Sequence, residues 1–249
     1  MGHFASHRVR VAAANPPPAP APAKQQRGKA IKPGKPLPSA IAQVTGAASA
    51  SQAAKGVAAG FEADLESLHG LTTEKKVELK RELVTKYRAH AEAVLAGPKT
   101  GVNDPVTAWW VLWLWDAGLI EEFITNCKRA EGLGLRSPIP TPLPMFRAWR
   151  IIEWTRAEIE AGHSPEPYFG QLFDEVGDYQ GNVAAEIFKL KGMLTQAAAE
   201  KEADPTKATE LFSAAEGFYQ EAAKRNEKVG VKTRLADVGA SLKKLVTGK

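Results

Sequence analysis

The chain has 249 residues, 44% of them hydrophobic and 24% charged, which is enough for one large or two small domains and excludes a chain that is disordered throughout. Alanine is frequent, aromatic residues make up only 8%, and no series of alternating β-branched strands is present. We therefore expect an all-α fold of helical hairpins.

The formal net charge of +5 is unevenly distributed. Residues 1–60 carry +8 and no acidic side chain, whereas the remaining residues carry −3. The same stretch holds eight of the seventeen prolines, and such a composition cannot bury enough apolar area to offset the entropy of ordering it. We expect a flexible basic arm over residues 1–60, whose cations would meet a polyanion first.

The cysteine count and the hydropathy pattern indicate the cellular compartment of the protein. Cys127 is the only cysteine, so it cannot form an internal disulfide, and no apolar run reaches the roughly 18 residues of a membrane span. The N-terminus lacks the apolar stretch of a secretion signal. These features predict a cytoplasmic protein.

Residues 61–100 form the expected N-terminal helical region, with a possible DNA-binding role. Apolar residues from Val77 to Val94 repeat at helical spacing behind a cap at Thr72 or Thr73. Because lysines, arginines and glutamates interleave on the polar side, a solvated face with i,i+4 ion pairs is the simpler interpretation. A helix-turn-helix variant over residues 61–95 is the alternative to a plain helical hairpin.

Residues 101–162 form a tryptophan-rich region. Asp104 and Pro105 predict a helix start, and four tryptophans follow within seven residues, at 109, 110, 113 and 115. We expect these rings in the core of the domain, with a shared subunit interface and a base-stacking platform as alternatives. A second helix is expected over residues 119–132, and alternating prolines from Pro138 to Pro144 predict an extended polyproline connector before a helix over residues 145–161.

Residues 163–249 are expected to form helical hairpins with a degenerate tetratricopeptide-like pattern of small residues, including Ala184, Gly192 and Ala208. Their expected role is packing and subunit contact, and hence possible oligomerisation, with peptide capture as the alternative.

The chain lacks the motifs of several enzyme classes. Five residues separate Gly28 from the Gly34-Lys35 pair, where a phosphate-binding P-loop has four, and Pro36 follows instead of a hydroxyl residue. The histidines are scattered and no Cys-x-x-Cys exists, so no metal site is expected. We expect no catalytic residue, no cofactor and no metal, and a protein that binds and organises.

Two parts of the sequence resemble a known family. The first part is the run from Leu112 to Gly118, the helix after it, and then Gly134, Leu135, Pro138, Thr141, Pro142 and Phe146. The second part is the N-terminal run from His3 to Arg8. Both resemble the small terminase subunits of temperate tailed phages, of the gene-M type. The resemblance implies a non-catalytic, mostly helical protein of the host cytoplasm. It implies a ring-like homo-oligomer that recognises the packaging site in double-stranded viral DNA and passes the DNA to a large subunit holding the ATPase and endonuclease.

The cations of the arm and of the 61–95 helices are the candidate DNA-binding residues. They are Arg8, Arg10, Lys24, Arg27, Lys29, Lys32, Lys35, Lys75, Lys76, Lys80 and Arg81. The alternative function is a helical-repeat adaptor between proteins, with the basic arm as a solubilising tail. A metal-dependent nuclease is a third interpretation that no motif supports.

Overall fold

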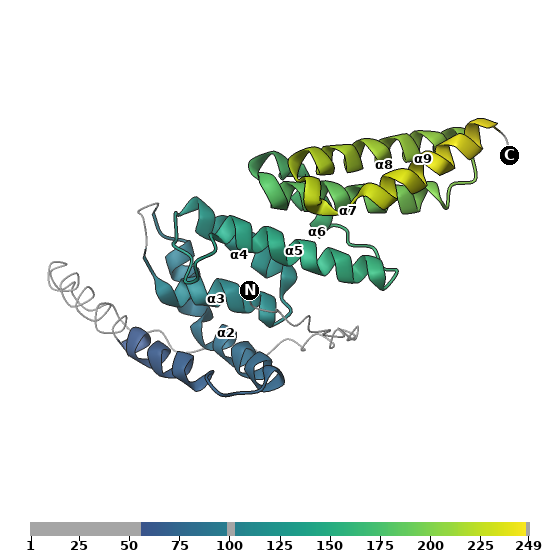
Figure 1. The fold of residues 1–249 in the computed structure, drawn as a ribbon. Helices are drawn as coiled ribbons and strands as arrows, with labels where there is room; N and C mark the ends of the chain where they lie inside the picture. Colours follow the sequence, from purple (N-terminus) through teal and green to yellow (C-terminus); the bar gives the residue numbers. More distant parts are fainter. Residues whose placement is uncertain (1–55, 99–102, 248–249) are drawn as a thin grey trace, which may run out of the picture. The chain divides into compact units, whose positions relative to one another are not determined.

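A computed structural model describes residues 56–98 and 103–247, and in these residues the secondary structure is helical with no strand (Figure 1). The expected all-α fold is confirmed. The seven candidate arm cations lie outside the described residues. The chain divides into two compact units, Met1–Lys76 and Val77–Lys249. None of the described helices is long and apolar enough to span a membrane.

In the first unit, residues 56–67 are helical and end in a short turn. The backbone N–H groups of Leu68 and His69 donate to the carbonyls of Leu65 and Glu66, and Gly70 follows with a φ of 75°. Helix α2 (Thr73–Leu95) then begins, and the Thr72 hydroxyl accepts from the Lys75 amide at 3.5 Å. This is the capping position that the sequence predicts.

In the second unit, α3 (Pro105–Asp116) carries the tryptophans. Its first turn is capped by Asp104, whose carboxylate accepts from the Thr107 amide at 2.7 Å. Trp110 and Trp113 are almost completely buried, and the Trp110 indole donates to the Val84 carbonyl of α2 at 2.9 Å. Their burial confirms for these two rings the expectation that the tryptophans form core, and the Val84 carbonyl supplies the acceptor that the buried Trp110 indole needs.

Helix α4 (Ile120–Gly132) buries Cys127 and is followed by the proline-rich connector. The connector has polyproline geometry at Pro142, with φ −57° and ψ 148°, but α5 (Leu143–Glu160) begins one residue later. The prediction that the extended segment reaches Pro144 is therefore wrong. A proline has no amide hydrogen and a fixed φ, so the first helical turn accommodates it.

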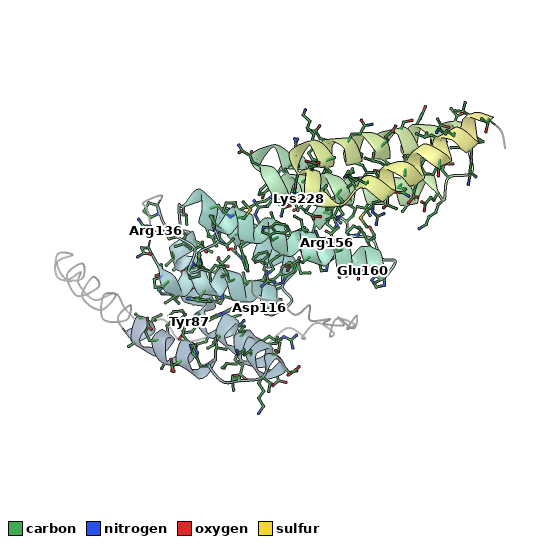
Figure 2. The ribbon with its side chains drawn as sticks, in the orientation of Figure 1. Tyr87, Asp116, Arg136, Arg156, Glu160 and Lys228 are labelled. Atoms are coloured by element: carbon green, nitrogen blue, oxygen red, sulfur yellow. The ribbon has the colours of Figure 1, made fainter. Side chains whose placement is uncertain are left out.

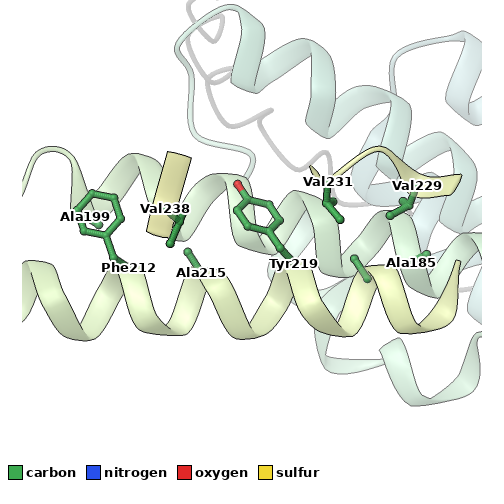
Figure 3. Close-up of a cluster of buried hydrophobic side chains, with 9 residues drawn as sticks. Ala185, Ala199, Phe212, Ala215, Tyr219, Val229, Val231 and Val238 are labelled. Atoms are coloured by element: carbon green, nitrogen blue, oxygen red, sulfur yellow. The ribbon is translucent and has the colours of Figure 1, made fainter. Parts of the chain in front are cut away.

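The remaining elements follow α5 in the order α6 (Tyr168–Asp174), the 3-10 turn η1 (Val176–Asp178), α7 (Gly181–Ala199), α8 (Pro205–Arg225), the 3-10 turn η2 (Glu227–Val229) and α9 (Lys232–Thr247). Helix α8 contacts both α7 and α9, and their shared apolar cluster includes Phe212, Tyr219 and Val238 (Figure 3). The tetratricopeptide-like character of this part stays a prediction.

Helices α7 and α8 approach closely at Gly192. A Cβ atom at this glycine would lie 2.6 Å from Cε1 of Tyr219, which is completely buried. The Tyr219 hydroxyl donates to the Gln196 side-chain oxygen at 2.8 Å, one turn further along α7. Only glycine gives the tyrosine ring this space against the neighbouring helix.

Candidate nucleic-acid interface

The four candidate cations of α2 have different surroundings. Lys75 is exposed and Lys76 is half-buried in the first unit, whereas Lys80 and Arg81 belong to the second. The Lys80 ammonium contacts the Asp116 carboxylate at the end of α3 at 2.5 Å, and both side chains are less than a third exposed. Arg81 is exposed and makes no ion pair with another described residue. Lys80 therefore holds two helices together, which a DNA contact alone would not require.

Lys80 is one of several residues that join α2 to α3 and α4. Arg88 contacts Glu122 at 2.6 Å, and the Arg129 guanidinium contacts Glu92 at 2.9 Å. Lys80, Arg88 and Glu92 lie at multiples of four residues, so they share one side of α2. The sequence showed the amphipathic helix but not these partners, which lie more than thirty residues away.

The Lys80–Asp116 ion pair leads to a stability prediction. We expect Lys80→Gln and Asp116→Asn each to lower the free energy of unfolding, and a double-mutant cycle to give a coupling of about 0.5–1 kcal/mol. Urea unfolding of the four proteins measures it. If the coupling energy is zero, and Lys80→Gln weakens DNA binding whereas Asp116→Asn does not, Lys80 is instead a DNA contact.

The outward side of α2 carries charges of both signs. The exposed residues include the cations Lys75 and Arg81 and the acids Glu74, Glu78 and Glu82. Such a surface attracts a phosphate backbone less than a uniformly basic one does. The α2 cations alone therefore make a poor DNA-binding surface, in line with the interpretation of a solvated face.

A second charged group lies inside the second unit, around Arg147 of α5. Only 5% of this side chain is exposed, and it contacts Glu131 of α4 at 3.0 Å and Glu175 at 2.7 Å. Lys128 also contacts Glu175. Burial acts to raise the Glu175 pKa, but hydrogen bonds and charge from Lys128 and Arg147 outweigh it, so the pKa lies below its ordinary value.

The Arg147 group borders two neighbouring hollows of about 450 and 420 Å³ beside the proline-rich connector, both lined by Glu131, Pro142 and Pro144. Tyr179 lines the larger one, and burial raises its pKa to about 12. The Arg147 guanidinium is neutralised by two carboxylates, so it is not available to an incoming phosphate. The sequence did not single out this group, which joins α4, α5 and the end of α6.

Two observations concern metal-binding and nucleophilic side chains in the described residues. These residues contain no group of three or more histidine, cysteine, aspartate and glutamate side chains that could hold a metal ion. Burial, together with the negative charge of Glu131, raises the pKa of the Cys127 thiol, which keeps it protonated and unreactive. This agrees with the interpretation of Cys127 as a small apolar core residue.

Comparison with known proteins identifies the family. Residues 59–181, which include α2 to α6, match the model of the phage small terminase subunit family. No curated protein and no solved structure matches the chain. Small terminase subunits act in packaging phage DNA in the infected host cell, together with a large terminase subunit, and are generally regulatory and not catalytic. Through residues 59–181, the chain belongs to the phage small terminase subunit family.

Proposed function

We propose that the chain binds double-stranded viral DNA at the site where packaging starts and recruits or stimulates the large subunit, which holds the ATPase and endonuclease. It acts in the host cytoplasm, without catalysis and without a cofactor. The observation that carries this proposal is the family match over residues 59–181, because small terminase subunits serve genome packaging.

The DNA contacts are proposed mainly for the arm, residues 1–60. Its candidate cations outnumber those of α2, and no acidic residue lies among them. Lys75, Lys76 and Arg81 supply further phosphate contacts, whereas the pairing with Asp116 makes Lys80 the weakest of the original candidates. Phosphate contacts of this kind give affinity without reading the base sequence.

Firm binding by such weak contacts then needs a second source, which we propose is assembly. A ring-like homo-oligomer, built through the hairpins of residues 163–249 with the tryptophan-rich core of residues 101–162 as its scaffold, presents many arms to one duplex. Once one arm has bound, tethering raises the effective concentration of the others, so weak contacts combine into firm binding.

Charge neutralisation in the full chain tests the role of the arm. We expect a variant in which the seven candidate arm cations are replaced by glutamine to bind packaging-region duplex more weakly than the original chain. The slope of log K against log salt should become shallower by about 6, because each phosphate contact contributes about 0.9. Fluorescence anisotropy at several salt concentrations measures the slope, and sedimentation checks that the oligomer mass is unchanged.

Three results would contradict the proposal. Absence of DNA binding by the original chain at low salt would favour the helical-repeat adaptor. Loss of assembly in the neutralised variant would show that the arm serves subunit contact and not DNA. Divalent-metal-dependent nicking by the isolated chain would make it a nuclease.

A further inference from the structure

The described part of the chain has a second uneven charge distribution, at its C-terminal end. Residues 224–247 contain seven lysines and arginines and two acidic residues, for a net charge of +5. The other described residues contain sixteen cationic and twenty-six acidic side chains, for a net charge of −10. The basic character of the chain is therefore not confined to the arm.

The residues at 224–247 comprise the last turn of α8, η2 and α9. The apolar side of α9 is already covered. Val238, labelled in Figure 3, is completely buried. Leu235, Leu242 and Leu245 pack against the cluster that α9 shares with α8. Because α8 takes this side, α9 presents charge to a partner and not an apolar face such as a membrane-surface helix needs.

The exposed lysines of this segment form what we call the α9 basic surface, made of Lys224, Lys228, Lys232, Lys243 and Lys244. Lys228, in η2, is labelled in Figure 2. Lys224 has a side chain that is 78% exposed and lies 3.9 Å from Glu221, too far for a strong ion pair. Between the α9 lysines, the exposed residues Ala236 and Ala240 have short side chains that leave the surface open to a bulky partner.

Two further cations of the segment are engaged within the fold and do not belong to the surface. Arg225 pairs with Glu221 and lies over the Phe188 ring, 4.4 Å from its centre. Arg234 is half-buried, and its positive charge acts against the burial that raises the Tyr219 pKa. The acids of the segment are Glu227 and Asp237, so lysines predominate among its exposed charges.

We propose that the α9 basic surface binds the phosphate backbone of duplex DNA. This inference rests on the proposed function, which supplies the duplex. Lys232 and Lys243 are about 16 Å apart along the helix axis, a length over which a duplex presents about nine phosphate charges. The rest of the described chain has a net charge of −10, so on balance it attracts a duplex less than the α9 basic surface does.

Two double variants of the full chain test the proposal. Lys232→Gln with Lys243→Gln removes two charges from the α9 basic surface, and glutamine maintains helix propensity. The matched control is Lys201→Gln with Lys207→Gln, which removes two exposed charges, one in the turn after α7 and one in the first turn of α8. The control lysines lie near Glu200, Glu202 and Asp204, where a duplex is not expected.

The measurement is the salt dependence of binding to packaging-region and random duplex. We expect the α9 variant to flatten the slope of log K against log salt by about 2 on both duplexes, and the control to change it by less than about 0.5. Circular dichroism confirms that both variants keep their helices. Because the two variants carry the same net charge, a difference between their slopes depends on the position of the lysines and not on the total charge.

Other outcomes overturn the proposal in distinguishable ways. If the original chain binds DNA and both variants keep its slope, the α9 surface is not a DNA contact and the proposed function stands. If the slope is kept but the α9 variant binds the large subunit more weakly, the surface serves an acidic protein partner. If the original chain binds neither duplex, the proposed function and this inference both fail.

Discussion

Replacing Arg147 by methionine is expected to lower the free energy of unfolding at neutral pH by about 3–5 kcal/mol. Methionine keeps much of the side-chain volume but leaves Glu131 and Glu175 facing each other without the guanidinium between them. Lys128 still neutralises part of this charge, because it contacts Glu175. Urea denaturation measures the loss, with the slope against denaturant checked for a change in the native state.

The loss should depend on pH. The Glu175 pKa lies below its ordinary value of 4.5 when the protein is folded, so this carboxylate stabilises the fold above that pH. The stabilisation disappears as the pH falls through the folded pKa, where protonation of Glu175 removes one of the two carboxylates that pair with Arg147. We therefore expect the difference between the original chain and Arg147→Met to shrink below about pH 4.

Arg136→Met is the matched control, because Arg136 is exposed in the loop after α4 (Figure 2). It should change the free energy of unfolding by less than about 0.5 kcal/mol at any pH in this range. An equal loss in the two variants, or a loss in Arg147→Met that does not vary with pH, would mean that apolar packing and not the ion group determines the stability at this position.

The second prediction concerns the close approach of α7 and α8. Gly192→Ala is expected to cost about 1–3 kcal/mol, although alanine favours a helix over glycine by about 1 kcal/mol. The added Cβ would lie 2.6 Å from Cε1 and 2.7 Å from Cδ1 of Tyr219. The ring cannot move aside easily, because it is completely buried and its hydroxyl is bonded to Gln196.

Gly217→Ala on α8 provides the control, since a Cβ there meets no atom within 4 Å. This substitution should leave stability unchanged or raise it by up to about 1 kcal/mol. Thermal unfolding should thus give opposite shifts for the two alanine variants. A rise in melting temperature for Gly192→Ala would show that the helices can separate at no cost and that Gly192 is not needed for their packing.

The sequence predicted much of this fold because local rules decide it. Asp104 and Pro105 start α3 as expected, since a capping carboxylate and a first-turn proline act within a few residues. Trp110 and Trp113 are buried as expected, since rings of that size are rarely left in water. The extent of the polyproline segment was predicted less well, because a proline suits both an extended chain and a first helical turn.

The candidate site was less predictable, because charge pairing depends on distant residues. Lys80 stays a candidate DNA contact, but its ion-pair partner Asp116 lies thirty-six residues away and could not be identified from the sequence. The carboxylates around Arg147 come from α4 and from the end of α6, and no local pattern brings them together. The α9 basic surface had a signal in the sequence, a local excess of lysine, which was obscured because the larger excess in residues 1–60 accounted for the total charge.

The environment of Cys127 has a practical consequence for studying assembly. It is the only cysteine of the chain, and it is completely inaccessible to solvent in α4. A thiol-reactive dye should therefore not react with it in the native protein and should attach to a cysteine introduced elsewhere. Energy transfer between such dyes would test the proposed assembly without altering the natural sequence at position 127. The rate at which the dye slowly modifies Cys127 itself would then measure how often the helices around it open.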